Sequence, residues 1–166
     1  TIATRHRHLI IKFGGHAMAA GLRLKKACFA DFLLAFQQAC DKQLDQAMLQ
    51  GKCYTDGELK PEDMGLELAE ILRYAAGPWG QGFPEPLFEG RFRLLAQRLV
   101  GDKHLKMTLG LQGSSQQVEA IAFNVSLSQW PNHRAEQINA RYRLDINYYQ
   151  GRKTLQLIVE ALDPLL

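Results

Sequence analysis

The chain has 166 residues, of which 46% are hydrophobic and 22% are charged, a balance that is typical of a globular protein and not of a wholly disordered chain. Its formal net charge is +3, and the excess lies in residues 89–166, which hold ten Lys or Arg against seven Asp or Glu. No apolar run reaches the roughly 18 residues of a membrane-spanning helix, and the three cysteines lack zinc-site or disulfide-framework spacing. We therefore expect a cytoplasmic, monomeric protein with a weak preference for polyanions.

The first fifty residues predict a small α/β unit. Leu9–Phe13 is a short apolar run followed by Gly14-Gly15, which is typical of a buried strand that ends in a turn. His16–Ala20 favours a helix with Gly21 as its C-cap, and Leu22–Leu24 is strand-like. A long helix with one apolar face follows, marked by Phe29, Phe32, Leu33, Phe36, Cys40, Leu44 and Met48. The first eight residues contain neither a start methionine nor a signal peptide, so we expect a piece of a longer protein.

Residues 51–87 are expected to form a helical connector. Pro61 suits a first helical position, and an apolar stripe continues from Met64 to Ala75. The stretch Gly77–Pro86 carries three prolines and three glycines, which excludes regular structure. Trp79 is expected to anchor this stretch against a domain.

Residues 88–166 change to a period of two, which indicates strands. The alternation is clearest over His104–Leu111 and Ala140–Tyr149. The expected strands are 91–100, 104–111, 118–125, 140–149 and 154–160. Five antiparallel strands with one longer link suit an OB-like barrel, although an SH3-like barrel fits almost as well. The fold class is therefore α+β, with an α/β unit over 1–50, the connector over 51–87 and the barrel over 88–166.

The barrel sequence carries cations and aromatic side chains of the kind that bind single-stranded nucleic acid. The basic candidates are Arg91, Arg93, Arg98, Lys103, Lys106, Arg141, Arg143, Arg152 and Lys153. Possible stacking platforms are Phe92, Tyr148 and Tyr149, although core packing is the commoner role for such residues. Arg141 and Arg143 are favoured because alternation puts both on the exposed side of one strand, and charge reversal there is expected to weaken binding.

The segment Lys12–Gly21 suggests a phosphate site. Gly14 and Gly15 would let backbone amides approach a ligand, and a helix beginning at His16 would direct its positive end at the same point. His16 would add a donor and Lys12 a charge. A tight turn with a surface histidine explains the same residues equally well.

The string Phe13–Gly21 resembles the DHHA1 domain of DHH-family phosphoesterases. Three later strings, Gly77–Phe88, Arg98–Lys106 and Tyr142–Asn147, resemble the bacterial RecJ family of exonucleases. The resemblance implies a 5′→3′ single-stranded-DNA exonuclease of DNA repair and recombination, whose first domain binds Mn²⁺ or Mg²⁺. It also implies that Gly14, Gly15 and His16 contact DNA near the scissile phosphate, and that an OB domain guides the strand.

The residues that would bind the metal are missing from this sequence. It contains no Asp-His-His string and no aspartate cluster with metal-ligand spacing. We therefore expect no metal site, no cofactor and no catalytic residue in this chain, and no cleavage of DNA by it.

Three other functions remain open. The barrel could be a protein-interaction module that docks the nuclease onto single-stranded-DNA-binding protein. A small-molecule phosphoesterase and an RNA-directed editing domain also carry DHHA1 domains, but the barrel argues against both.

Overall fold

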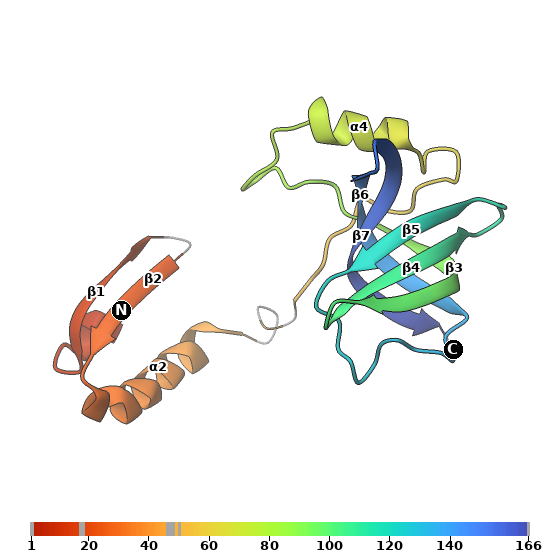
Figure 1. The fold of residues 1–166 in the computed structure, drawn as a ribbon. Coiled ribbons are helices and arrows are strands. Elements are labelled where there is room, and N and C mark those ends of the chain that lie inside the picture. The colour runs from red at the N-terminus through yellow and green to blue at the C-terminus, as the bar shows by residue number, and fades with distance from the viewer. Residues whose placement is uncertain (1, 17–18, 46–48, 50, 166) are drawn as a thin grey trace. The chain divides into compact units, whose positions relative to one another are not determined.

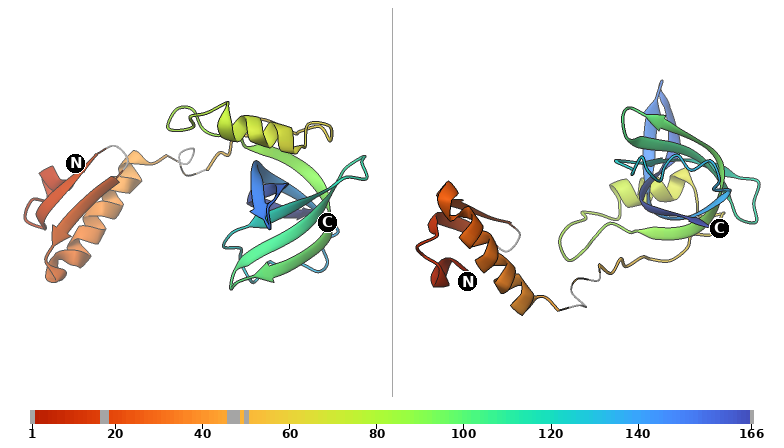
Figure 2. Two further views of the ribbon diagram at one scale, coloured as in Figure 1. Left: turned by 45° about the horizontal axis from the view of Figure 1, so that its top comes forward. Right: turned by 90° about the horizontal axis from the view of Figure 1, so that it is seen from below.

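The structure is a computed structural model that describes residues 2–16, 19–45, 49 and 51–165. The chain divides into two compact units, residues 1–53 and 54–166. Figure 1 shows the fold of each, and Figure 2 gives two further views. Among the described residues, every helix falls short of the length and apolarity that crossing a bilayer demands.

The first unit is a β-hairpin with helices beside it. It contains α1 (Ile2–Arg5), β1 (Ile10–His16), β2 (Ala19–Leu24), the 3-10 helix η1 (Lys26–Cys28) and α2 (Phe29–Gln43). The strands β1 and β2 pair antiparallel, with Gly14 opposite Gly21 and Gly15 opposite Ala20. The views agree that α2 lies alongside this hairpin (Figures 1 and 2).

The helix predicted over His16–Ala20 is wrong at every residue that can be placed. His16 ends β1, and Ala19 and Ala20 begin β2, while Ala17 and Met18 lie outside the described residues. Five residues are too few to nucleate a helix alone, so pairing with the preceding strand prevails. A Cβ atom on Gly15 would lie 2.7 Å from the carbonyl oxygen of Ala19, which shows how closely the strands approach there.

The apolar faces predicted for this unit are only partly buried. Leu9 is buried, but Ile11 and Phe13 are 58% and 64% exposed, so the strand predicted as buried is mostly at the surface. The helix α2 stops at Gln43, earlier than predicted, and Met48 lies outside the described residues. Ala35 is buried on α2, whereas its larger apolar side chains Phe29, Leu33, Leu34 and Phe36 are exposed.

The second unit is a closed five-stranded barrel with one helix packed on it. The strands are β3 (Phe88–Val100), β4 (His104–Leu111), β5 (Gln117–Ala122), β6 (Gln137–Tyr149) and β7 (Arg152–Leu165), and the helix is α4 (Leu66–Tyr74). The barrel order is β3-β4-β5-β7-β6. The apolar positions of the alternating pattern face the barrel interior, as predicted. Leu105, Met107 and Leu109 are each at most 1% exposed. Tyr142 is fully buried, with its ring 5.4 Å from that of Phe92.

The all-antiparallel barrel predicted from the sequence is wrong in one pairing. The strands β5 and β7 run parallel, with Ala120 opposite Leu157, so the barrel is mixed. The long link between β5 and β6 lets the chain cross to β3, against which β6 pairs antiparallel. The following strand β7 pairs antiparallel to β6 and therefore meets β5 in the parallel sense.

The helix α4 contacts the Pro- and Gly-rich stretch Gly77–Pro86 that follows it. The helix begins at Leu66 after the N-cap Gly65, later than Pro61 suggested, and it packs on β6 and β7. The indole Nε1 of Trp79 donates a hydrogen bond to the carbonyl of Leu72 at 3.0 Å. The Trp79 ring also lies 5.0 Å from the ring of Phe83, so Trp79 contacts both α4 and the stretch that follows it, and its anchoring against a separate domain stays a prediction.

Candidate nucleic-acid interface

Three arginines on the outer face of β3 define what we call the arginine strip: Arg91, Arg93 and Arg98. Arg93 lies opposite Gly110 in the β3–β4 pairing, and Arg98 lies opposite Lys106. All three are exposed, and none makes an ion pair within the part of the chain that the structure describes. Arg93 Nη2 donates a long hydrogen bond of 3.4 Å to the Ser114 carbonyl, which carries no charge, so no carboxylate among the described residues offsets the positive charge of the strip.

A β-bulge brings Arg98 onto the same face as the other two arginines. In a regular strand, Arg98 would point into the barrel with Phe88 and Phe92, because side chains alternate. The register shifts between Leu94 and Ala96, so inward and outward positions exchange after the bulge. Arg98 therefore pairs with the outward-facing Lys106. Phe92 is only 2% exposed, so it belongs to the core and is not the stacking platform that was considered.

The neighbouring strand β4 adds partly neutralised charge. Lys106 Nζ lies 3.1 Å from Glu119 Oε2, and the Thr108 hydroxyl donates to Glu119 Oε1 at 2.8 Å. Lys103 is exposed in the turn before β4. Glu119 therefore weakens the contribution of Lys106, and the strip on β3 remains the stronger source of positive potential.

The two arginines favoured from the sequence are ion-paired on β6. Arg141 lies 3.0 Å from Asp163, and Arg143 lies 3.5 Å from both Glu85 and Glu160. Alternation correctly puts both on the outer surface, but the sequence cannot show that carboxylates from β7 and the connector reach them. Each carboxylate offsets charge that a phosphate would otherwise meet.

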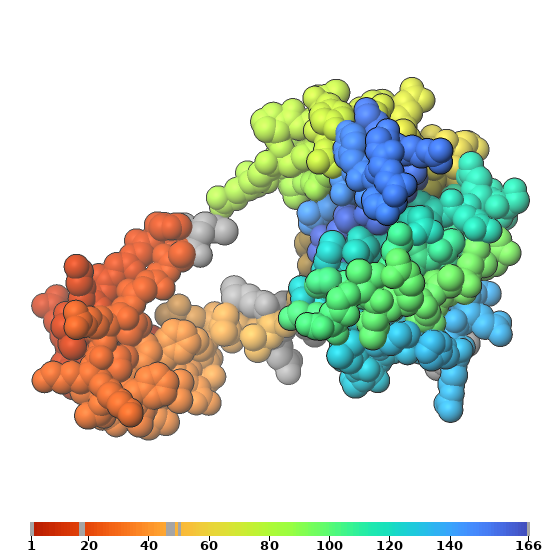
Figure 3. Space-filling model, viewed as in Figure 1, coloured from red at the N-terminus to blue at the C-terminus, as the bar shows by residue number. Residues whose placement is uncertain are grey.

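The β6–β7 hairpin lies against α4, as the space-filling view shows in blue and yellow-green (Figure 3). Lys153 Nζ lies 2.9 Å from Glu70, and Arg73 pairs with Asp145. The hydroxyls of Tyr74 and Tyr148 are 2.7 Å apart. Tyr148 is 52% exposed and so remains accessible despite this contact. Its partners on α4 were not foreseen, because nothing in their local sequence marks them.

The tip of this hairpin carries two more predicted residues. Tyr149 is 68% exposed, and it pairs with Arg152, which is exposed and has no ion pair among the described residues. An exposed ring beside an uncompensated cation suits a stacked base, but the tip offers only one such cation.

The Tyr74–Tyr148 contact predicts a pH response that can be measured. The hydrogen bond with Tyr148, followed by partial desolvation, raises the pKa of Tyr74 above its ordinary value. The associated stability is present below the unfolded-state pKa of about 10 and is lost as pH rises through the folded-state pKa. In Tyr148→Phe, we expect the pKa of Tyr74 to fall back toward its ordinary value, as followed by NMR of ring-labelled tyrosine. The matched variant Tyr149→Phe should leave the titration of Tyr74 unchanged; an equal shift in both variants would contradict the assignment.

The predicted phosphate site at the paired glycines has a different geometry from the one expected. Lys12, Gly14, Gly15 and His16 all lie in β1, so the glycines are strand residues and not a turn before a helix. No helix begins at His16, and the helix dipole therefore gives no reason for a phosphate to bind there. A DNA contact at these residues stays a prediction.

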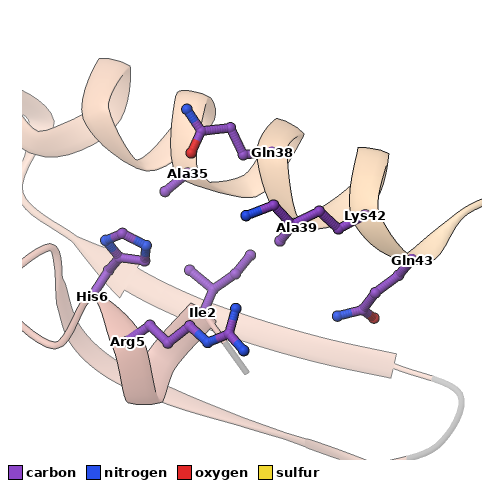
Figure 4. Close-up of a pocket in the computed structure, with 8 residues that line it drawn as sticks. All are labelled: Ile2, Arg5, His6, Ala35, Gln38, Ala39, Lys42 and Gln43. Carbon is purple, nitrogen blue, oxygen red and sulfur yellow. The ribbon is translucent and has the colours of Figure 1, made fainter.

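A small pocket in the first unit gathers basic side chains that the sequence did not single out. It has a volume of about 90 Å³ and lies between α1 and α2 (Figure 4). Arg5, His6 and Lys42 line it without any acidic side chain. The pocket is positive and shallow, and it is too small to hold a nucleotide.

The residues that the structure describes do not provide a metal centre. They include no cluster of three or more His, Cys, Asp or Glu side chains that could hold a metal ion. The donor set that Mn²⁺ or Mg²⁺ requires is therefore not met by these residues, and no step of metal chemistry is assigned to them.

Comparison with known proteins agrees with the barrel and its topology. The family model described as the RecJ OB domain matches residues 55–161. The chain is 47% identical over 162 residues to the "Single-stranded-DNA-specific exonuclease RecJ" of Salmonella typhimurium, and 45% identical to the protein of that name from Escherichia coli. Each alignment covers 98% of this chain but 28% of the relative, so the chain spans less than a third of those proteins.

A solved structure shares the fold. The crystal structure of RecJ in complex with Mn²⁺ from Thermus thermophilus aligns with a TM-score of 0.68 and 21% identity. The alignment covers 99% of this chain and 24% of that one. Because the family model covers well over half of the sequence, the chain belongs to the RecJ OB domain family.

Proposed function

We propose that the barrel binds single-stranded DNA and positions it for a RecJ-type 5′→3′ exonuclease. The observation that carries this proposal is the arginine strip, three exposed cations without carboxylate partners among the described residues, on one strand of an OB barrel. Nucleic-acid binding needs such cations, because contact with phosphates releases condensed counterions. The names of the relatives support the choice of substrate, since they are exonucleases specific for single-stranded DNA.

We further propose that residues 1–53 are the end of a DHHA1 domain and that hydrolysis is supplied by a part of the enzyme outside this chain. The Phe13–Gly21 string supports the first assignment, together with a similarity to RecJ proteins that extends over 98% of the chain. The poor fit of the described residues to a metal supports the second. In this scheme the barrel contributes affinity and direction, while Mn²⁺ or Mg²⁺ and the attacking water belong elsewhere.

A salt titration of the purified chain tests the proposal. With a labelled oligothymidylate, we expect the logarithm of the association constant to fall linearly with the logarithm of salt concentration. Three phosphate contacts correspond to a slope of about −2. Added Mn²⁺ should leave the oligonucleotide intact.

Three results would count against this proposal. Absence of binding at low salt would remove the DNA-binding role from this chain. Salt-tolerant binding to single-stranded-DNA-binding protein, without binding to the oligonucleotide, would instead make the barrel a protein-docking module. Degradation of the oligonucleotide would contradict the assignment of hydrolysis to another part of the enzyme.

A further inference from the structure

A groove opens beside the β-bulge of β3, between Arg93 and Arg98 of the arginine strip. Its volume is about 600 Å³, which lies within the range of small-ligand sites. Arg93, Leu95 and Gln97 line one side, and His133, Ala135 and Glu136 line the other. The second side belongs to the long link between β5 and β6, so two segments distant in sequence form the groove.

Hydrogen bonds fix the two walls relative to each other. The side-chain amide of Gln97 donates to the Asn132 carbonyl at 2.7 Å and accepts from the Asn132 amide at 2.9 Å. The Leu94 amide also donates to the carbonyl of Glu136 at 2.8 Å. In the same link, Trp130 is only 4% exposed and belongs to the barrel core. A ligand that enters the groove therefore meets walls that are already ordered, which lowers the entropic cost of binding.

An apolar side chain at the bulge faces outward into this groove. Leu95 has no partner in the β3–β4 register and is 43% exposed. A Cβ atom on Gly110 would lie 3.3 Å from Leu95 Cδ1 and 3.1 Å from Arg93 Nη2. Because position 110 is glycine, both side chains can lie close over the backbone of β4. The result is an apolar surface directly beside a guanidinium group.

The charge around the groove favours an anionic ligand. Arg93 and the exposed Arg98 and Arg134 make no ion pairs within the described part of the chain, and Glu136 is the one acid among the groove residues. A base has two flat apolar faces and is attached to a phosphate. The apolar faces of a base match Leu95 and the His133 ring, and the phosphate matches Arg93.

We propose that this groove holds one nucleobase of the bound single strand, with the adjoining phosphate at Arg93. This proposal rests on the proposed function, because it assigns a place to a strand that the arginine strip attracts. It makes Leu95 and His133 binding residues, although neither was predicted from the sequence.

The test compares two exposed leucines of the barrel unit. Leu95→Ser should weaken oligothymidylate binding by roughly tenfold, the loss of one apolar contact with a base, while leaving the salt slope unchanged. Leu127→Ser is the matched control, because Leu127 is 58% exposed and does not line the groove. Thermal unfolding of both variants separates loss of binding from loss of fold. An oligonucleotide carrying 5-bromodeoxyuridine should crosslink to residues 93–97 and 133–137 of the unaltered chain.

Each other outcome has a definite meaning. Equal losses in Leu95→Ser and Leu127→Ser, or crosslinks confined to β6 and β7, overturn the groove but leave DNA binding intact. If Leu95→Ser abolishes binding of a synthetic aspartate- and phenylalanine-rich peptide but not of the oligonucleotide, the groove is a protein site and the proposal is wrong. Failure of the unaltered chain to bind the oligonucleotide overturns the proposed function and this inference together.

Discussion

Replacing Arg91, Arg93 and Arg98 with glutamine is expected to lower the affinity of the chain for oligothymidylate by roughly 100-fold at low salt. This estimate takes about 1 kcal/mol for each charged contact that is lost. The salt slope should also become shallower by about 0.7 for each arginine, or about 2 for all three. The physical reason is that these guanidinium groups have no carboxylate partner among the described residues, so phosphates are their available counterions. Fluorescence anisotropy over a range of salt concentrations measures both quantities.

The paired arginines on β6 provide the control for this experiment. Arg141→Gln combined with Arg143→Gln removes two positive charges, but both charges are already offset by Asp163, Glu85 and Glu160. We expect a loss of affinity of only about twofold to threefold, because exposed ion pairs contribute little and leave little net charge. An equal or larger effect of the β6 variant would show that β6 is the principal interface, as the sequence alone suggested.

Residues 54–166 are expected to fold in isolation, whereas residues 1–53 are expected to remain largely unfolded. The barrel unit contains a continuous core that includes fully buried Leu105, Leu109, Ile138 and Leu157. In the described part of residues 1–53, the buried hydrophobic residues are only Leu9 and Ala35. So small a buried surface cannot offset the conformational entropy of more than fifty residues.

Circular dichroism and thermal unfolding of the two pieces measure this difference. The barrel piece should show strand structure and a cooperative transition, and the hairpin piece should show neither. The barrel piece should also keep most of the oligonucleotide affinity, since the arginine strip lies entirely within it. A cooperative transition of residues 1–53 alone would contradict the account, as would loss of binding by a folded barrel piece.

Sequence periodicity identified the barrel because the barrel core depends on it. Leu105, Met107 and Leu109 alternate with polar residues, and each points inward. Periodicity could not predict the parallel pairing of β5 with β7, because a strand has the same alternation whether its neighbour is parallel or antiparallel. The strand order depends on where the link between β5 and β6 leads, and the residues of that link do not specify this in isolation.

The candidate site was harder to predict for two physical reasons. The sequence identified the cations but not their partners, so Arg141 was favoured over Arg93, although Arg141 is ion-paired and Arg93 has no ion pair among the described residues. Alternation also fails at a bulge, which is why the outward position of Arg98 could not be counted from Phe92.

The paired glycines illustrate the opposite error. The helix over His16–Ala20 was predicted from local helix propensity, without regard to strand pairing. His16 and Ala20 instead belong to the two strands of one hairpin. Five residues with good propensity form a helix only if tertiary contacts support it. Both glycines were expected to leave amides open to a ligand. In the hairpin, Gly15 lets two backbones approach closely, whereas a Cβ atom on Gly14 would meet no atom within 4 Å.

The central claim is that the outer face of β3 is the DNA interface of this barrel. Chemical-shift mapping of the uniformly labelled 166-residue chain during titration with oligothymidylate tests it most directly. We predict the largest shifts at the backbone amides of Arg91–Arg98 and at the facing residues of β4. Shifts concentrated at Arg143–Asn147 on β6, with β3 unaffected, would contradict it.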